Sequence, residues 1–329
     1  MMLPVWLLVG CSGAEDVPDV DTSGTALQEV VLQTDWYAQP EHGGFYQAML
    51  SGLYEQAGLA VEIRPGANMT NVPQMVATRR IDFAVGTTDN IFMATSRGAP
   101  LLVLFPYFQH DPQCVMFHVS NGLETLADLQ GRLLMIAPGA AYVQYLRKAL
   151  QIEPQLIPLD YGLARFLANP ELVQQCFLTS EPYYVAQQNV EADYLRLSSS
   201  GFDPYRVVYT HRDMLQEKPE LVRAFTQASL QGWADYMVGD GALVHPVLGQ
   251  RNPQQTAEFA AFSKQAMQDN ELVYGSAADG EALGHFDRER LLLHLQHLRQ
   301  IDLLDSEVPL DDMVAFELQE FVLAAPGVP

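Results

Sequence analysis

The segment DWYAQPEH at positions 35–42 combines aromatic and polar side chains directly after a short apolar run. Trp36 and Tyr37 offer faces on which a flat ring can stack, and Asp35 and His42 offer hydrogen-bonding groups for its edge. Gly44 follows in a Gly-Gly pair that leaves the N–H groups of the next helix accessible. These residue types at this spacing predict one wall of a binding site for a flat heteroaromatic molecule. The alternative is that Trp36 packs within its own domain.

Further candidates lie after predicted strands or at the starts of predicted helices, where backbone N–H groups are free. They are Phe45, Thr87, Thr88, Asp89, Gly139, Tyr142, Glu181 and Tyr183. The Glu181 carboxylate can accept a hydrogen bond from an exocyclic amino group, and Tyr183 adds aromatic surface beside it. Each has a structural alternative, because Phe45 suits a core, Thr and Asp cap helices, and a Glu in a first turn complements the helix dipole.

The sequence contains no motif for metal, nucleotide or nucleophilic chemistry, since the patterns GxGxxG, Walker A, GxSxG and HExxH are absent. His294 and His297 lie three residues apart with His285 nearby, but no third metal ligand is visible. A solvated or half-buried helix face is the favoured interpretation. We therefore predict no catalytic residue, no metal and no cofactor.

Strand and helix patterns alternate from residue 29 onward. Strands are predicted over 29–33, 61–64, 81–85 and 101–105, with helices over 43–57 and 72–78. The pattern restarts with a short helix over 125–129, strands over 132–136 and 175–178, and helices that begin near Ala140 and Glu181. Such crossovers predict mostly parallel sheets covered on both faces. Two α/β units place a cleft between them, at the strand ends that carry the candidate residues.

The C-terminal third reads as helical. Pro219 fits the first turn of one helix, Asn252-Pro253 is expected to cap another, and Asp287 starts a Leu-rich helix through Leu303.

The N-terminal segment MMLPVWLLVGCSG has the pattern of a bacterial lipoprotein signal. An apolar run from Leu3 to Val9 precedes Cys11, whose thiol would be acylated after cleavage ahead of it. The run is shorter than the roughly 20 apolar residues of a membrane-spanning helix. Residues 12–28 are acidic and lack apolar periodicity, so we expect a disordered tether. The alternative is an apolar terminus without a processing role.

The charge balance excludes nucleic acid as a partner. Lys and Arg total 18 against 40 Asp and Glu, which gives a formal charge of −22 over 329 residues. Neutralising phosphates needs clustered basic residues, which this chain lacks. After Cys11 only Cys114 and Cys176 remain. An oxidising periplasm would allow them to pair, but buried thiols are the favoured interpretation.

The segment TDWYAQPEHGGFYQAMLSGLYEQAGLAVEIRPG resembles the opening of ABC-transporter periplasmic solute-binding proteins of the sulfonate-binding and thiamine-pyrimidine-synthase-like family. TRRIDFAVGTTDNIFMATSRGAPL, the EPY at 181–183 and KPELVRAFTQASLQGWADY agree with it, so the likeness spans about residues 30–236. It implies a type II periplasmic-binding-protein (venus-flytrap) fold. In that fold two doubly wound α/β lobes surround a cleft, here with a helical C-terminal third.

The resemblance also implies how the chain is organised and what it does. We expect a signal at 1–11, a tether at 12–28, the first part of lobe 1 at 29–110, lobe 2 at 111–208, and a return to lobe 1 with C-terminal helices at 209–329. Such a protein would be a monomer in the periplasm, lipid-anchored to a bacterial membrane, or at the cell surface of a Gram-positive bacterium. It would deliver a small molecule to an ABC permease and its ATPase.

The family also contains the fungal-type pyrimidine synthase, which is the enzyme alternative. That enzyme carries a Lys and a His ahead of the Arg-Gly-x-Pro turn, where this chain has Gly86 and Asn90. Its Cys cluster for iron is also missing here. Covalent and oxidative chemistry would therefore lack its groups, and we predict that the chain is not an enzyme.

The residue types also favour one class of ligand. The cleft turns of lobe 1 contain no arginine, and the net charge repels anions at long range. Aromatic and carboxylate side chains instead favour a neutral or weakly cationic heterocycle, with a thiamine-precursor aminopyrimidine as the first choice. A sulfonate, a flavin or another small molecule in the same fold is the alternative.

Overall fold

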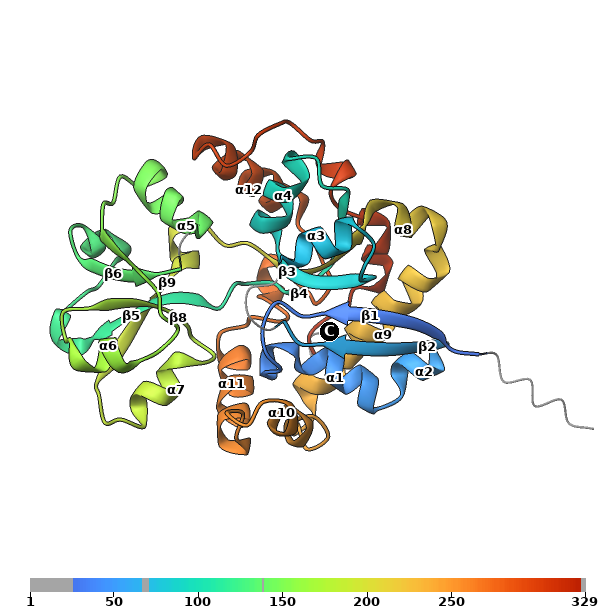
Figure 1. Ribbon diagram of the computed structural model, residues 1–329, viewed down its shortest axis with the longest axis horizontal. Helices are drawn as coiled ribbons and strands as arrows, with labels where there is room; N and C mark the ends of the chain where they lie inside the picture. The colour runs from blue at the N-terminus through green and yellow to red at the C-terminus, as the bar shows by residue number, and fades with distance from the viewer. Residues whose placement is uncertain (1–25, 67–70, 138, 327–329) are drawn as a thin grey trace, which may run out of the picture.

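The computed structural model describes residues 26–66, 71–137 and 139–326, which form two α/β lobes joined by two chain crossings (Figure 1). Cys11, the predicted signal and the predicted tether up to residue 25 lie outside the described residues. The last predicted tether residue, Gln28, already begins the first strand. Within the described ranges, no helix combines the length and the apolar character that spanning a membrane requires.

The sheet of lobe 1 has five strands in the order β2-β1-β3-β10-β4. Their bounds are β2 (Leu59–Arg64), β1 (Gln28–Gln33), β3 (Phe83–Thr87), β10 (Arg206–His211) and β4 (Leu101–Phe108). Strand β1 pairs in parallel with β2 and β3, and β10 is antiparallel to both β3 and β4. The mostly parallel sheet predicted for this unit is confirmed.

The sheet of lobe 2 repeats this design in the order β7-β6-β8-β5-β9. Its strands are β7 (Gln155–Pro158), β6 (Leu133–Ile136), β8 (Val173–Phe177), β5 (Gln113–His118) and β9 (Ala192–Arg196). Strand β6 is parallel to β7 and β8, and β5 is antiparallel to β8 and β9.

In each sheet the antiparallel strand is the one that arrives from the other lobe. Strands β5 and β10 therefore begin at the edge where the parallel strands end, and this edge faces the opposite lobe. Arg206 is paired with Thr87 and Phe108 at this edge. The expected end of lobe 2 at residue 208 differs from the sheet pairing, because residues 206–208 already pair within the lobe 1 sheet.

Helices cover both faces of the lobe 1 sheet (Figure 1). One face carries α1 (Gly43–Leu50), α2 (Leu53–Gln56) and α9 (Pro219–Val238), with one hydrophobic cluster. The opposite face carries α3 (Val72–Ala77), α4 (Thr88–Ser96) and α12 (Arg288–Gln300), with a second cluster. The other helices are α5 (Ala141–Gln144), continued by a π-helical turn (Tyr145–Ala149), α6 (Ala164–Ala168), α7 (Glu181–Ala186), α8 (Arg212–Glu217), α10 (His245–Arg251) and α11 (Ala257–Asp269).

Three helix predictions are wrong. The helix predicted over 43–57 is divided into α1 and α2, because Gly52 between them adopts a positive φ of 77°. Asn252 ends α10 instead of starting a helix, and α11 begins at Ala257, where the Thr256 hydroxyl accepts a hydrogen bond from Phe259 N at 3.2 Å. The Leu-rich helix ends at Gln300 instead of Leu303, because Asp302 adopts a positive φ of 59° that an α-helix does not allow.

Cys114 and Cys176 form a disulfide, so the prediction of buried thiols is wrong. The two residues lie directly opposite each other on the antiparallel strands β5 and β8, with their Cα atoms 5.0 Å apart. This cross-strand position brings the two side chains together, which their separation of 62 residues in sequence does not reveal. A disulfide of this kind persists in oxidising compartments.

Candidate functional site

Arg206, the first residue of β10, is the centre of a buried polar cluster at the inter-lobe edge of lobe 1. Its guanidinium pairs through Nη2 with the Asp35 carboxylate, and its Nε donates to the Tyr107 hydroxyl at 3.2 Å. Its Nη1 lies 3.5 Å from Asp111 Oδ2. Arg206 is only 6% exposed. Every nitrogen of this guanidinium is therefore near an oxygen of the protein itself.

Asp35 and His42, which the sequence places in one polar group, do meet. His42 Nε2 lies 3.0 Å from Asp35 Oδ1, and the imidazole is fully buried. Although burial raises the pKa of Asp35, the Arg206 charge and the contact with His42 lower it to about 2. At Asp111 the balance is reversed, because burial outweighs the Arg206 charge and raises the pKa to about 7.

The buried polar atoms without a hydrogen-bond partner among the described residues include three close to this cluster: Glu41 Oε2, His42 Nδ1 and Asp89 Oδ1. Leaving such a group unpaired costs on the order of 1–3 kcal/mol. Burial also raises the pKa of Glu41 and of Asp89, against smaller opposing effects that include the Arg206 charge. Unpaired buried groups near one arginine mark a place where a bound molecule would supply the missing partners.

Lobe 2 contacts this cluster directly. Thr179 Oγ1 donates to Glu41 Oε1 at 2.6 Å, and Thr179 lies just after β8. The ring centroid of Phe177 lies 5.7 Å from the Arg206 guanidinium carbon. The candidate site is therefore built from both lobes.

Trp36, in the turn after β1, also contacts the opposite lobe. Its ring centroid lies 5.4 Å from that of Tyr161, which follows β7, and 5.5 Å from that of Tyr37. The alternative that Trp36 packs only within its own lobe does not match these contacts. Tyr37 is 39% exposed and is the most open of the predicted aromatic residues.

Glu181 starts α7, as predicted, and its carboxyl folds back onto the end of β8. Oε2 accepts a hydrogen bond from Phe177 N at 2.7 Å. Burial, with a smaller contribution from the neighbouring Glu41 charge, raises the pKa of Glu181 to about 7 against the effect of this hydrogen bond. Two carboxyl groups from different lobes thus lie close enough to influence each other.

Thr87 ends β3 at the inter-lobe edge, and Thr88 and Asp89 begin α4 directly after it. The Thr87 hydroxyl accepts from Asn90 Nδ2 at 2.8 Å, and the Thr88 hydroxyl accepts from Tyr205 N at 3.2 Å. Both hydroxyls therefore bond to other protein groups, but neither bond caps α4, because its N-cap residue Thr87 makes no side-chain capping hydrogen bond. Asp89 keeps the unpaired oxygen described above.

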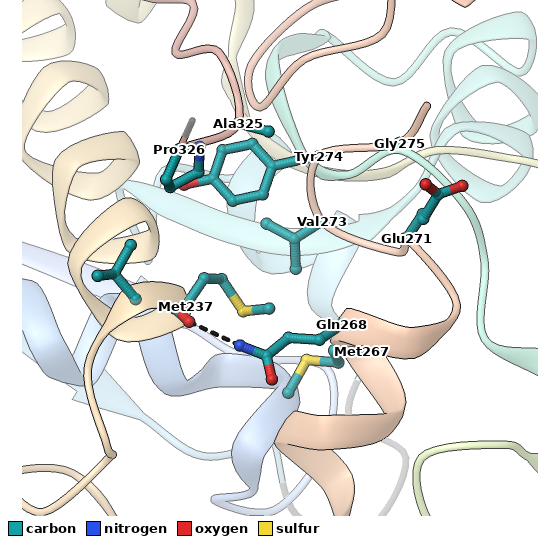
Figure 2. A pocket seen from close by; sticks show the side chains of 10 residues that line it. Met237, Met267, Gln268, Glu271, Val273, Tyr274, Gly275, Ala325 and Pro326 are labelled. Carbon is teal, nitrogen blue, oxygen red and sulfur yellow. Dashed lines mark hydrogen bonds between the residues drawn. The ribbon is translucent and has the colours of Figure 1, made fainter. Parts of the chain in front are cut away.

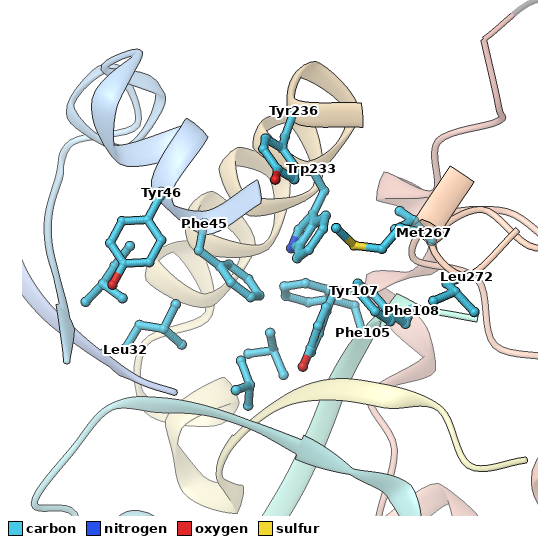
Figure 3. Close-up of a cluster of buried hydrophobic side chains, with 14 of the residues drawn as sticks. Leu32, Phe45, Tyr46, Phe105, Tyr107, Phe108, Trp233, Tyr236, Met267 and Leu272 are labelled. Carbon is cyan, nitrogen blue, oxygen red and sulfur yellow. The ribbon is translucent and has the colours of Figure 1, made fainter. Parts of the chain in front are cut away.

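Gly44 and Phe45 lie in the core of lobe 1 (Figure 3). A Cβ added at Gly44 would lie 2.2 Å from the Trp233 ring, so this glycine allows α1 to approach α9 closely. The Phe45 ring meets Tyr107 and Trp233 edge-on, with centroids 5.3 and 5.6 Å away. Phe45 thus supports Tyr107, which in turn bonds Arg206.

Of the remaining lobe 2 candidates, Tyr142 and Tyr183 also have structural partners. Tyr142 is buried and donates to Gln175 Oε1 at 3.1 Å. Gly139 lies in an exposed turn with a φ of 83°. The Tyr183 ring packs against Phe259 and Phe262 of α11, with centroids 5.3 Å from each.

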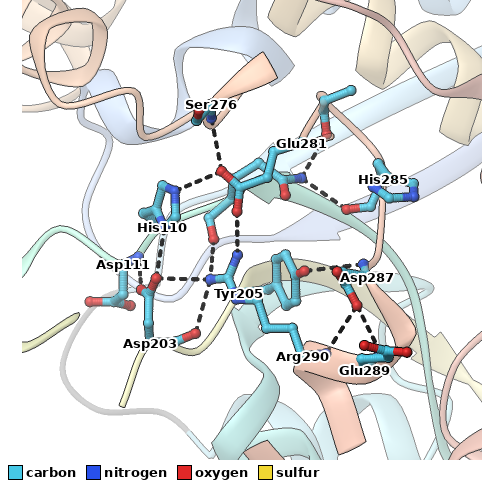
Figure 4. A network of polar contacts seen from close by, with 12 residues as sticks. His110, Asp111, Asp203, Tyr205, Ser276, Glu281, His285, Asp287, Glu289 and Arg290 are labelled. Carbon is cyan, nitrogen blue, oxygen red and sulfur yellow. Dashed lines mark hydrogen bonds and ion pairs between the residues drawn. The ribbon is translucent and has the colours of Figure 1, made fainter. Parts of the chain in front are cut away.

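Both chain crossings between the lobes meet in a second polar network (Figure 4). His110, in the crossing to lobe 2, contacts Asp203, in the crossing back, at 2.6 Å and Glu281 at 2.9 Å. Arg290 Nη2 donates to Gln109 O at 2.6 Å and to Asp203 Oδ2 at 2.9 Å. Although burial opposes it, these carboxylates raise the pKa of His110 to about 9. The network fixes both crossings to the C-terminal part of lobe 1.

Two other features lie apart from the inter-lobe cluster. A pocket of about 400 Å³ on lobe 1 is lined by residues that include Met237, Met267, Tyr274 and Pro326, and it shares no residue with the cluster (Figure 2). His294 is only 5% exposed, with its ring near Phe202, so the solvated or half-buried helix face predicted for it is wrong. Across residues 26–66, 71–137 and 139–326, no set of three or more His, Cys, Asp or Glu side chains could hold a metal ion.

Sequence reasoning missed four residues of the cluster: Glu41, Tyr107, Asp111 and Arg206. Glu41 lies in the segment DWYAQPEH at 35–42, and its position directly before His42 could have identified it as a candidate site residue. Arg206 was not predicted because it starts a strand, whereas ligand-contacting residues were expected after the ends of strands and at the starts of helices.

Comparisons with known proteins relate the chain to binding proteins of small heteroaromatic molecules. The formylaminopyrimidine-binding protein of Halalkalibacterium halodurans is 22% identical over 249 residues, which cover 72% of this chain and 73% of that protein. The riboflavin-binding protein RibY of Chloroflexus aurantiacus is 24% identical over 316 residues, which cover 90% and 86%. A Haemophilus influenzae protein assigned to thiamine biosynthesis is 27% identical over 107 residues, and the match spans only 34% of its length. Relatives named as enzymes also occur, such as the 4-amino-5-hydroxymethyl-2-methylpyrimidine phosphate synthase of Legionella pneumophila, 21% identical over 239 residues that cover 68% of this chain and 74% of that enzyme.

Solved structures establish the fold. The periplasmic aliphatic sulphonate-binding protein SsuA of Escherichia coli superposes with a TM-score of 0.65 at 14% identity, covering 92% of this chain and 95% of SsuA. The predicted type II periplasmic-binding-protein fold is thereby confirmed. Residues 39–240 match the family described as NMT1/THI5 like. Since this match covers more than half of the chain, the protein belongs to the NMT1/THI5-like family.

Proposed function

We propose that this protein is the substrate-binding lipoprotein of an ABC importer, and that it captures a small heteroaromatic nutrient between its lobes. A thiamine-precursor aminopyrimidine is the favoured ligand. The observation that carries the proposal is the buried inter-lobe cluster, in which Glu41, His42 and Asp89 each keep an unpaired polar atom.

The charge arrangement of the cluster supports a ligand that donates hydrogen bonds. Asp35, Asp111 and the Tyr107 hydroxyl already surround the Arg206 guanidinium, so it has little left to offer an anion. A sulfonate would need free donors here. The carboxyl groups of Glu41, Asp89 and Glu181 instead suit the amino group and the ring nitrogens of a heterocycle, because a carboxyl accepts from an amino N–H and, when protonated, donates to a ring nitrogen.

Trp36 and Phe177 would contribute the faces for a flat ring. Trp36 lies beside Tyr161 of lobe 2, and Phe177 lies against the Arg206 guanidinium. The predicted site residues Asp35, Trp36, Tyr37, His42, Asp89 and Glu181 keep their roles in this proposal. In this proposal the remaining candidates have structural roles and do not contact the ligand. They are Thr87, Thr88, Gly44, Phe45, Gly139, Tyr142 and Tyr183.

The relatives that are binding proteins support a transport role without turnover. Capture and release by lobe movement requires a permease and an ATPase as partners, and a site in the periplasm or at the cell surface. Lipidation of Cys11 would hold the protein near that permease. The disulfide between Cys114 and Cys176 supports an oxidising compartment independently of the N-terminal segment.

Binding measurements test the ligand. The purified protein would be unfolded and refolded to release any bound molecule, then titrated by calorimetry with 4-amino-5-hydroxymethyl-2-methylpyrimidine, riboflavin and an alkanesulfonate. We expect one-to-one binding of the pyrimidine, at least tenfold weaker in Trp36→Ala. Tight binding of the sulfonate alone would refute the proposed ligand class. Tight binding of riboflavin alone would mean that the ligand is a flavin and not a pyrimidine.

The role in transport has its own test. Cys11→Ser should move the protein from the membrane fraction to the soluble fraction, with the affinity for the pyrimidine unchanged. Consumption of the pyrimidine by the purified protein would contradict a pure binding function and would favour the synthase alternative.

A further inference from the structure

Glu41 is a buried acidic residue, and one of its two carboxyl oxygens has no hydrogen-bond partner in the described parts of the chain. It lies in the 3-10 turn Pro40–His42 between β1 and α1 and is only 4% exposed. Among the described residues it forms no ion pair, and only one of its carboxyl oxygens is hydrogen-bonded. A buried carboxyl without a cation is costly unless it is neutral or receives partners from elsewhere.

The bonded oxygen joins the lobes. Thr179 Oγ1 donates to Glu41 Oε1 at 2.6 Å, and the fully buried Thr179 lies in lobe 2, immediately after β8. Because this bond joins residues of different lobes, it forms only when the lobes are closed. The second oxygen, Oε2, then faces no protein donor or acceptor.

The unpaired oxygen suits a particular pattern of ligand atoms. Burial raises the pKa of Glu41, which favours a protonated carboxyl. Such a group donates through Oε2–H, while Oε1 keeps a lone pair beside the Thr179 bond. A ring nitrogen next to an exocyclic amino group presents the complementary acceptor and donor, side by side.

We propose that Glu41 recognises the paired ring nitrogen and amino group of an aminopyrimidine-like ligand, and that Thr179 couples this recognition to closure of the lobes. This inference rests on the proposed function and specifies which residue selects the ligand. Glu181 remains the second carboxyl near the ligand, with its own bond to Phe177 N.

The test compares two probes that differ only in the amino group: 4-amino-5-hydroxymethyl-2-methylpyrimidine and 5-hydroxymethyl-2-methylpyrimidine. We expect the wild-type protein to bind the amino compound roughly ten- to a hundredfold more tightly by calorimetry. Glu41→Leu should bring this ratio close to one. Glu41→Gln should keep most of it, because an amide also donates and accepts side by side.

Thr179→Val separates recognition from closure. It should weaken binding of both probes by a similar factor, roughly three- to tenfold, and leave their ratio unchanged. Glu55→Gln, an exposed change on α2, is the matched control for Glu41→Gln, and circular dichroism with thermal unfolding verifies that each variant folds.

The outcomes are distinct. Binding of neither probe by the wild-type protein overturns the proposed ligand and this inference with it. Three results would overturn the role of Glu41 alone. They are a wild-type protein that binds both probes with similar affinity, a ratio of the two affinities that is unchanged in Glu41→Leu, and an equal loss of this ratio in Glu41→Gln and Glu41→Leu. Wild-type affinity in Thr179→Val overturns the coupling to closure.

Discussion

Glu181 offers a quantitative test of the site, because its ionisation opposes folding. Its pKa rises from 4.5 to about 7 on burial, so the folded protein keeps this proton over a pH range in which the unfolded chain has lost it. Stability therefore falls as the pH rises from about 4.5 to 7 and stays reduced above that range. Each pH unit is worth about 1.4 kcal/mol, which gives about 3 kcal/mol at pH 8.

Glu181→Gln removes this titration and keeps an oxygen that can accept from Phe177 N. We expect the ligand-free variant to match the wild-type protein at pH 4.5 and to be about 3 kcal/mol more stable at pH 8. Urea unfolding at both pH values measures the difference, which corresponds to a rise in Tm on the order of 5 °C. Glu55→Gln, at an exposed position, should reproduce the wild-type pH profile.

Parallel pH profiles for the wild-type protein and Glu181→Gln would refute the reasoning. They would mean that water or structural relaxation keeps the Glu181 carboxylate as well solvated in the folded protein as in the unfolded chain. The gain in stability should accompany a loss of affinity for the pyrimidine, because an amide accepts an amino N–H less strongly than a carboxylate.

Three further perturbations test other parts of the structure. Replacing Cys114 and Cys176 by Ala should cost about 4 kcal/mol in urea unfolding, from the 62-residue separation that the disulfide closes, and a cost near zero would contradict the cross-link. The pKa of His110 is raised to about 9, so its stabilising contribution is complete below about pH 6.5 and is lost as the pH rises through 9. His110→Gln should flatten the fall of stability between pH 7 and 10, and an unchanged slope would exclude this histidine as its source. Gly44→Ala should destabilise by about 3 kcal/mol or more, because the added methyl overlaps the Trp233 ring, and wild-type stability would show that α1 can shift away.

The order of the strands and helices was predictable because each carries its own periodic pattern. The strand before Asp35 and the helix start at Gly43 follow from local sequence, and so does the positive φ of Gly58 after α2. The pairing of distant segments was not predictable in this way. Cys114 meets Cys176 only because β5 runs antiparallel to β8.

The candidate site shows the same limit. Asp35 and His42 are close in sequence, and their contact was expected from the turn that joins them. Arg206 reaches them from 171 residues away, at the start of a strand that returns from lobe 2. The expectation that no arginine lies at this place is wrong, and the proposed ligand class depends on Asp35, Asp111 and Tyr107 already holding the guanidinium.

The two lobes differ in how the chain supplies their strands, and this has a consequence for synthesis. Every strand of the lobe 2 sheet comes from one continuous stretch, 113–196, and its disulfide lies within that stretch. Lobe 1 lacks β10 and α9 until the chain has been made beyond residue 238. Because the polypeptide emerges with its N-terminus first, we expect lobe 2 to fold and to form its disulfide before lobe 1 is complete. The opening 110 residues would wait as an incomplete sheet, exposed to chaperones and proteases, until the returning strand is inserted between β3 and β4.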